Sequence, residues 1–303
     1  MSLPRQYRLR AGDKPAIFSG MKNFLIAGLL MTATSALAQD PLTAPIECDN
    51  CTQWNEAAKP VHLYGNAFYV GVAGLSSVLI ATGQGLILID GDMPQSVPLI
   101  EANIRSLGYR VEDIKYILVS HEHFDHVGGV AALKRDSGAR VFAGAAAAEA
   151  LGQGHPTPAD AQSDTHPYPP VAGVETVKDG QKLTLGAVTV TAHRTPGHTP
   201  GSTSWSWKSC EQGRCLDIVY SDSLTAISTV VGYRFNPVKR SFKASIAKIR
   251  ALPCDLLVTT HPGASDFWQR TEKGALIDAQ ACKTLADGAE KTLDRRLGEE
   301  AAH

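Results

Sequence analysis

A short stretch near the middle of the chain contains four side chains that could bind metal. It reads His121-x-His123-x-Asp125-His126 and follows the apolar residues 116–120. Borderline-soft ions such as Zn²⁺ take neutral imidazole nitrogen and carboxylate oxygen, and residues this close in sequence can share one tight turn. The apolar run before the cluster and the glycine pair after it are typical of a loop held by a scaffold, not of a solvated histidine tract. The pattern therefore predicts a metal site with ligands for two ions.

Two further histidines could complete the ligand set. His198 lies in the Gly- and Pro-rich residues 195–202, which predict a turn between strands. His261 directly follows the apolar residues 256–260. Because each lies at the end of an expected strand, we interpret both as ligands. The histidines without this setting are His62 and His193, within strand patterns, and His155 and His166, in a long loop.

Composition places the chain among ordinary globular proteins. It has 303 residues, is 44% hydrophobic and 19% charged, and has a formal net charge of −1. Binding to a nucleic-acid backbone requires clustered cations, and the sequence contains no block of Lys and Arg. We therefore expect no nucleic-acid partner.

The first part of the chain has the pattern of a secretory signal. Residues 21–23 supply a positive start, residues 24–31 an apolar core, and residues 36–38 a small-residue cleavage site. The apolar stretch is too short to span a bilayer, which argues against a retained anchor. We expect residues 1–38 to be removed, with Met21 as the candidate true start. The mature chain would then be periplasmic, without a membrane attachment.

Six cysteines follow the expected signal, and an even number in an oxidising compartment suggests disulfides. We expect Cys210 to pair with Cys215 across a short turn, and Cys254 to pair with Cys282 across a longer loop. Cys48 and Cys51 are compatible with a local disulfide or with two inert thiols. A redox pair would require a strand-to-helix setting that this stretch lacks.

Residues 39–303 predict a single α/β domain. Apolar periodicity indicates helices over residues 96–107, 130–135, 145–151, 244–252 and 279–297. Strand patterns cover residues 61–72, 77–82, 86–90, 116–120, 141–143, 183–185, 188–193, 202–207, 216–220 and 256–260. This order suggests two sheets covered by helices. The irregular residues 152–173 are long enough to predict a functional loop.

The HxHxDH cluster, the later Gly-His loop, Asp90 after a strand and His261 before the last helices resemble the metallo-β-lactamase superfamily. The resemblance covers nearly all of the mature chain. It implies an αββα sandwich, in which helices cover two mixed sheets and the metal site lies at one edge between them.

Residues 222–225, Asp-Ser-Leu-Thr, resemble subclass B3 of the β-lactamases in particular, as do residues 195–202 and 261–265. The first two subclasses place a cysteine where Ser223 stands. Thioesterases and lactonases of the same fold place a metal-bridging Asp nearby, a role that Asp222 would take in that alternative.

The resemblance implies two zinc ions per chain. One would be held by His121, His123 and His198, and the other by Asp125, His126 and His261. Three protein ligands per ion leave an open position for water, whereas a structural zinc is usually closed with four. Asp125 would also orient the attacking water, which makes it the expected catalytic residue. Ser223 and Thr225 would bind the substrate, and Asp90 and Asp222 would orient ligand imidazoles.

The implied function is zinc-dependent hydrolysis of the β-lactam amide bond of penicillins, cephalosporins and carbapenems, conferring antibiotic resistance. We expect a monomer acting on a small molecule, with residues near Trp54 and residues 152–173 forming walls of the groove. Three alternatives remain: a lactonase or thioesterase of the same fold, an iron-dependent redox relative, and a zinc-stabilised binding protein without catalysis. The redox relative is disfavoured because the chain has no room for extra flavin-binding sequence. The binding protein would require closed metal shells.

Overall fold

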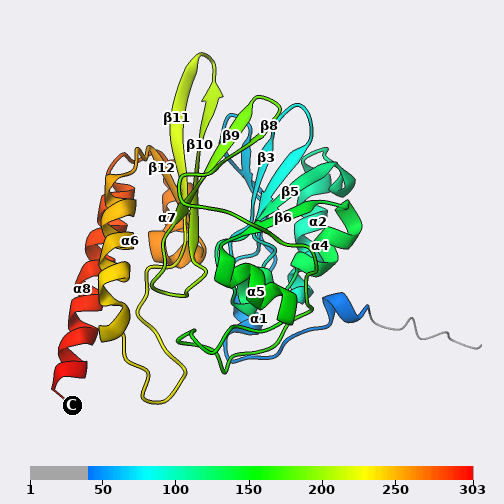
Figure 1. Cartoon of the computed structure of the whole chain (residues 1–303). Helices are drawn as coiled ribbons and strands as arrows, with labels where there is room; N and C mark the ends of the chain where they lie inside the picture. The colour runs from blue at the N-terminus through cyan, green and yellow to red at the C-terminus, as the bar shows by residue number, and fades with distance from the viewer. Residues whose placement is uncertain (1–39, 303) are drawn as a thin grey trace, which may run out of the picture. The chain divides into compact units, whose positions relative to one another are not determined.

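The computed structural model describes residues 40–302, so the expected signal and the candidate start at Met21 lie outside the described residues. The described chain forms a helix–sheet–sheet–helix sandwich (Figure 1). The expected αββα architecture is confirmed. Within residues 40–302, no helix is long and apolar enough to cross a membrane.

The first sheet has seven strands in the order β1-β2-β3-β4-β5-β6-β7. Their bounds are Val61–Tyr64, Ala67–Tyr69, Val78–Ala81, Leu86–Ile89, Ile114–Leu118, Arg140–Ala143 and Glu175–Thr176. Pairing is antiparallel from β1 to β4 and parallel from β4 to β7, so the sheet is mixed.

The second sheet has five strands in the order β12-β11-β10-β9-β8. Their bounds, from β8 to β12, are Lys182–Leu185, Val188–Arg194, Thr203–Glu211, Arg214–Ser221 and Leu256–Thr259. The β11–β12 pair is parallel and the others are antiparallel. Gln212 and Gly213, both with positive φ, form the tight turn that joins β10 to β11.

Helices cover the outer face of each sheet. The longer ones are α2 (Val97–Ser106), α4 (Val130–Ser137), α5 (Ala145–Gln153), α6 (Lys239–Ala251) and α8 (Ala281–Ala301). Apolar residues of α2, α4 and α5 pack against the first sheet, and those of α6 and α8 pack against the second. A third apolar cluster fills the space between the sheets.

Strand β4 is a continuous apolar run because both of its faces are buried. Leu86 and Leu88 belong to the cluster beneath the helices, whereas Ile87 and Ile89 belong to the cluster between the sheets. A strand covered on both faces needs apolar side chains at every position. The run therefore holds the buried Asp90, at its end, in a fixed place.

Helix boundaries differ from the expected ones mainly where the sequence is polar. Helix α6 begins at Lys239, five residues before the expected start at 244. The sequence pattern missed this first turn because it is basic, and the first buried side chain of the helix is Phe242. The short helices α1 (Cys51–Trp54), α3 (Phe124–Val127) and α7 (Phe267–Glu272) were not expected from the sequence.

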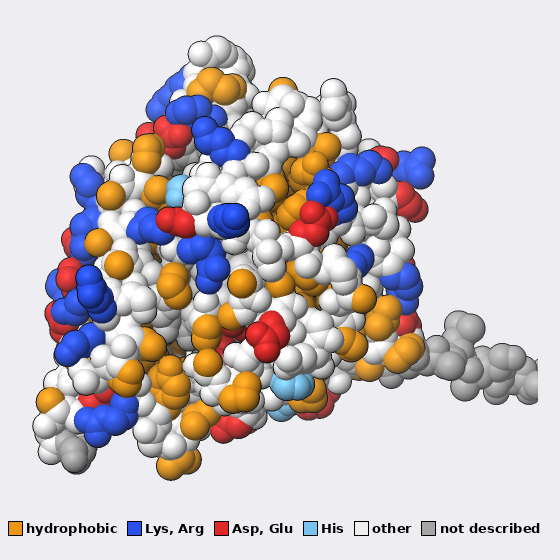
Figure 2. Space-filling view, in the orientation of Figure 1, with side chains coloured by type: hydrophobic (Ala, Val, Ile, Leu, Met, Phe, Trp, Pro, Cys, Tyr) orange, Lys and Arg blue, Asp and Glu red, His pale blue; other side chains and the backbone are white. Residues whose placement is uncertain are grey.

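Charged side chains of both signs cover the surface. Figure 2 shows Lys and Arg side chains among Asp and Glu on the face that it presents. Several are paired, including Arg140 with Glu175 and Lys248 with Asp179. Such exposed pairs contribute little to stability, about 0–1 kcal/mol each.

All six cysteines are paired in the structure, as Cys48–Cys51, Cys210–Cys215 and Cys254–Cys282. Cys210 and Cys215 face each other across the β10–β11 pair. Cys254 precedes β12 and Cys282 lies in the first turn of α8, so their bond fastens the last helix to the second sheet. Cys48 is bonded to Cys51, the first residue of α1.

We predict that the Cys254–Cys282 bond contributes most to stability. Its sequence separation is 28, against 5 for Cys210–Cys215. The chain-entropy model gives about 3–4 kcal/mol for the first bond and about 2 kcal/mol for the second. Guanidinium unfolding of C254S/C282S and of C210S/C215S, each with intact disulfides elsewhere, measures both losses. Equal losses would contradict the entropic account.

Candidate metal centre

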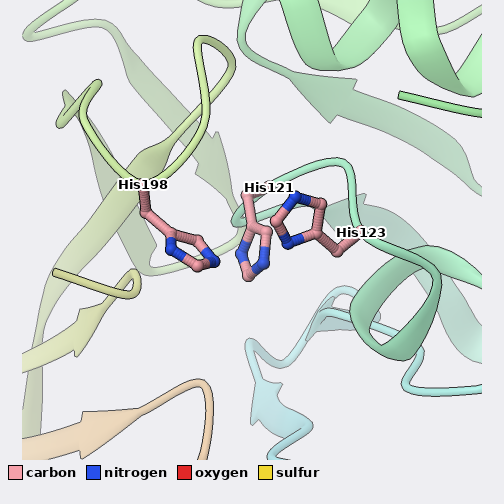
Figure 3. Close-up of side chains that lie close together, drawn as sticks. All are labelled: His121, His123 and His198. Atoms are coloured by element: carbon pink, nitrogen blue, oxygen red, sulfur yellow. The ribbon is translucent and has the colours of Figure 1, made fainter. Parts of the chain in front are cut away.

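The candidate metal centre lies at one edge of the sandwich, where strands of both sheets end. His121 and His123 follow β5 of the first sheet, and His261 follows β12 of the second. His198 lies in the loop between β9 and β10. Figure 3 shows the rings of His121, His123 and His198 pointing toward one another from these two loops.

Two groups of three side chains converge at this edge. In each group, one potential ligand atom from every residue lies within 4.8 Å of the others. The first group is His121, His123 and His198, and the second group is Asp125, His126 and His261. These are the two ligand sets that the resemblance implied.

Hydrogen bonds leave one nitrogen of His121 and one of His198 free to bind a metal. His121 donates from Nδ1 to Asp222 Oδ1 at 2.7 Å, and its buried Nε2 has no hydrogen-bond partner in the described residues. His198 donates from Nδ1 to the carbonyl of Thr225 at 2.9 Å. Each ring is therefore oriented through Nδ1 and offers Nε2.

His123 is oriented the other way round. Its Nε2 lies 3.1 Å and 3.2 Å from the two carboxylate oxygens of Asp160, which leaves Nδ1 for a metal. Asp160 belongs to the long loop of residues 152–173 and is buried. Sequence reasoning did not single out Asp160, since nothing in the sequence links it to His123.

The second group is a compact triangle. Asp125 Oδ2 lies 3.1 Å from His126 Nε2 and 3.2 Å from His261 Nε2, and the two nitrogens are 3.2 Å apart. Tetrahedral zinc with bonds of about 2.0–2.1 Å has ligand atoms about 3.3 Å apart. Donation from His261 Nδ1 to the carbonyl of Gly74 at 3.2 Å keeps Nε2 on this triangle. The donor set and its spacing fit a zinc ion.

Burial favours the neutral, metal-binding form of His121, His126 and His198. Burial lowers the pKa of His121 well below its ordinary value, and the neighbouring imidazoles add to this effect. Burial also lowers the pKa of His126, and it lowers the pKa of His198 to about 3. Burial acts in the same direction on His123, but the hydrogen bond and charge of Asp160 outweigh it and raise the pKa.

Asp125 is held as a carboxylate. Burial alone would raise its pKa, but the charge and hydrogen bond of His126, together with His261, lower it well below the ordinary value. An ionised carboxylate is the form that coordinates a metal. Asp125 is thus the single anionic group among the six converging side chains.

Of the two expected orienting carboxylates, Asp222 contacts an imidazole and Asp90 does not. Asp90 accepts hydrogen bonds from Ser120 N at 2.7 Å, Ser120 Oγ at 2.6 Å and Tyr220 OH at 2.8 Å. The prediction that Asp90 orients a ring directly is wrong, because Ser120 lies between Asp90 and His121. Asp90 instead fixes the backbone that leads into the cluster.

Ser223 and Thr225 both line the cavity at the metal centre. Ser223 Oγ lies 2.8 Å from Thr260 Oγ1, and Thr225 Oγ1 lies 3.1 Å from His198 Nδ1. Thr225 therefore has a role that was not expected, since its carbonyl also orients His198.

The metal centre opens into a cavity of about 830 Å³. Trp54 from α1, Phe124, and Gln162 and Thr165 from the long loop line it, as do residues of the inner face of α8. The ring of Trp54 lies 5.2 Å from the ring of His261. The expected walls near Trp54 and in residues 152–173 are therefore present. His62, His155, His166 and His193 lie outside both ligand groups.

The model of the metallo-beta-lactamase superfamily matches residues 70–261, which contain all six converging side chains. The chain belongs to this superfamily. Its similar solved structures include subclass B3 enzymes, as the sequence predicted.

Solved structures of that subclass match nearly their whole length. MEM-A1, a subclass B3 metallo-beta-lactamase from a soil metagenome library, is 44% identical with a TM-score of 0.80. The match covers 82% of this chain and 99% of MEM-A1. The metallo-beta-lactamase MIM-1 from Novosphingobium pentaromativorans is 40% identical with a TM-score of 0.79, over 82% of this chain and 93% of MIM-1.

A different activity appears among curated relatives. A hydroxyacylglutathione hydrolase of Cereibacter sphaeroides is 32% identical over 167 residues, which are 55% of this chain and 54% of that protein. The chain thus matches about half the length of this curated relative.

Proposed function

We propose that this protein is a dizinc subclass B3 β-lactamase that hydrolyses the amide bond of β-lactam antibiotics and confers resistance. The observation that carries the proposal is the pair of three-ligand groups facing one cavity, in a chain similar to subclass B3 enzymes over nearly their whole length. A zinc ion in each group would have three protein ligands and an open position, the arrangement of catalytic zinc sites.

Bound zinc would lower the pKa of a water molecule to about 7 and polarise the substrate carbonyl. The protein would supply the geometry for this chemistry. Neutral imidazoles would offer their lone pairs to each ion, and the carboxylate of Asp125 would orient the attacking water. The hydroxyls of Ser223 and Thr225 would donate hydrogen bonds to the substrate carboxylate and place the lactam carbonyl near the ligand groups.

A lactonase or thioesterase activity is the second candidate, supported by the similarity to hydroxyacylglutathione hydrolases. It requires Asp222 to bridge the two metals. Asp222 instead accepts from Nδ1 of His121, whereas the nitrogen left for a metal is Nε2. These atoms lie on opposite sides of the ring, so the contact favours an orienting role for Asp222 and the lactamase.

One assay separates the candidates. The purified mature chain is given a penicillin, a cephalosporin, a carbapenem, a homoserine lactone and a glutathione thioester, with and without a chelator. We expect β-lactam hydrolysis that the chelator abolishes and added Zn²⁺ restores. Turnover of the lactone or thioester alone would establish the alternative, and turnover of none would favour a non-catalytic zinc protein.

Export to the periplasm and a monomeric state complete the proposal. We expect the secreted protein to begin at Gln39, to be recovered with the periplasmic fraction and to have the mass of one chain in solution. N-terminal sequencing and light scattering test these points. A protein that begins at Met1 or Met21 and stays with the membrane would contradict the signal assignment.

Ser223→Ala should raise KM for β-lactams about fivefold and change kcat little. The variant removes one neutral hydrogen bond to the substrate carboxylate, and such a bond contributes about 1 kcal/mol. Steady-state kinetics measure both constants. Ser228→Ala is the control, because its hydroxyl donates to the backbone at Ala161 and Val230 and is absent from the cavity lining. A loss confined to kcat would contradict a role in substrate binding.

A further inference from the structure

Glu122 is a fully buried carboxylate that the proposed reaction does not use. It lies between His121 and His123 in sequence, and its relative exposure is 0%. Buried carboxylates normally have a cationic partner, but no Lys or Arg in the described residues forms an ion pair with Glu122. Its burial therefore requires another explanation.

Both oxygens of Glu122 are bound to the loop that carries His198. Thr199 Oγ1 donates to Oε2 at 2.7 Å, and Gly201 N donates to Oε1 at 3.0 Å. Glu122, which lies between His121 and His123, thus binds the loop that carries His198.

The fit around this carboxylate leaves little room for displacement. A Cβ added to Gly201 would lie 2.2 Å from Glu122 Oε2 and 2.5 Å from the backbone nitrogen of Ala147. Thr199 is also held by Ser202, whose Oγ accepts from Thr199 N at 3.2 Å. Any side chain at position 201 would force Glu122, the backbone at Ala147 or the His198 loop to move. The position of this loop is therefore set by close packing as well as by hydrogen bonds.

This link joins parts of the site that come from different sheets. His121 and His123 follow a strand of the first sheet, whereas His198 lies between two strands of the second. The bond from His198 to Thr225 orients its ring, but Thr225 follows β11 and also belongs to the second-sheet side. Glu122 provides a direct connection between the two sides of the first ligand group.

We propose that Glu122 is a positioning residue that fixes the His198 loop against the His121–His123 turn and thereby sets the metal affinity of the first ligand group. The second group, Asp125, His126 and His261, does not depend on this loop. The inference rests on the metal-binding part of the proposed function and not on the identity of the substrate.

The experiment compares Zn²⁺ affinity in apo variants, using competition with a chromophoric chelator. Two reference variants, His198→Ala and His261→Ala, assign each dissociation constant to one ligand group. We expect Glu122→Ala to weaken the first group about 10- to 100-fold, the range for residues that orient metal ligands. The second group should change less than about threefold, and Glu122→Gln should fall between wild type and Glu122→Ala, because its amide oxygen can serve only one donor.

Glu300→Ala is the matched control. Glu300 is also a buried carboxylate that accepts two backbone hydrogen bonds, from Phe235 N at 2.7 Å and Asn236 N at 3.1 Å, but it lies in α8 outside both ligand groups. Thermal unfolding of the apo proteins should show that both variants are destabilised. Only Glu122→Ala should lose affinity at the first group.

A double-mutant cycle tests the contact itself. Thr199→Val should weaken the first group in the wild type and have no further effect in Glu122→Ala, because the two residues act through one interaction. Equal loss at both groups, unchanged affinity in Glu122→Ala or additive effects in the cycle would overturn the proposal, as would a wild type whose first group binds no metal. Since no substrate is used, a protein that binds two ions without β-lactam turnover would refute the lactamase and leave this result standing.

Discussion

Asp125→Asn should lower kcat/KM for β-lactam hydrolysis by at least about 10²-fold, the loss typical of removing one electrostatic contributor from a water-excluded site. Asp125 Oδ2 lies 3.1 Å and 3.2 Å from the ring nitrogens of His126 and His261. The amide keeps the size of the side chain but removes the charge that the ion requires. It also removes the carboxylate proposed to orient the water.

Steady-state kinetics with excess Zn²⁺, together with the zinc content of the dialysed variant, test this prediction. We expect about one ion per chain to be lost and the remaining activity to stay low when zinc is restored. Asp136→Asn serves as the control, because Asp136 is paired with Arg135 on the surface. Wild-type kcat/KM in Asp125→Asn would contradict the assigned role.

The convergence of these six side chains could be predicted from the sequence because each carries a local signal. His121, His123, Asp125 and His126 form one short motif after an apolar strand, and His261 directly follows another. Strand ends of an α/β sandwich meet at one edge, so residues at these positions come together once the sheets form. His198 has the weakest local signal, since only the turn around it and the count of ligands pointed to it.

The groups that orient these side chains could not be predicted in the same way. Asp160 lies 37 residues from His123, in a loop without periodicity. Glu122 stands at a position that the HxHxDH pattern leaves unspecified, and its partners lie 77 and 79 residues later. The strand pattern before Asp90 indicated a buried carboxylate near the site, but the predicted contact with an imidazole is absent. The hydroxyl and backbone N–H of Ser120 donate to its two oxygens instead. Such contacts depend on the packed loops, which no spacing rule describes.

For the fold as well, features with a local sequence pattern could be predicted and features that depend on packing could not. Apolar patterning was sufficient to predict two sheets with helices, as the buried run Leu86–Ile89 illustrates. The layer order came from the resemblance, because strand patterns do not reveal which sheet a strand joins. The short helices α1 and α7 were missed, since four to six residues are too few to show a helical period. One of these, α1, provides Trp54 to the cavity wall.

Asp222→Ala should weaken the first ligand group about 10- to 100-fold and leave the second nearly unchanged. Asp222 Oδ1 accepts from His121 Nδ1 at 2.7 Å, and both side chains are buried. Without the carboxylate, the ring can rotate, and its Nδ1–H is left unpaired in the interior. Asp222→Asn should retain more affinity, because its amide oxygen can still accept this hydrogen bond.

This pair of variants also separates the lactamase from the thioesterase alternative. An orienting Asp222 predicts the loss of zinc from one group alone, with most affinity retained in Asp222→Asn. A bridging Asp222 predicts loss from both groups in both variants, because the amide removes a ligand shared by the two ions. Zinc content and the two dissociation constants distinguish these outcomes, and loss at both groups would move the assignment of this chain toward thioester or lactone hydrolysis.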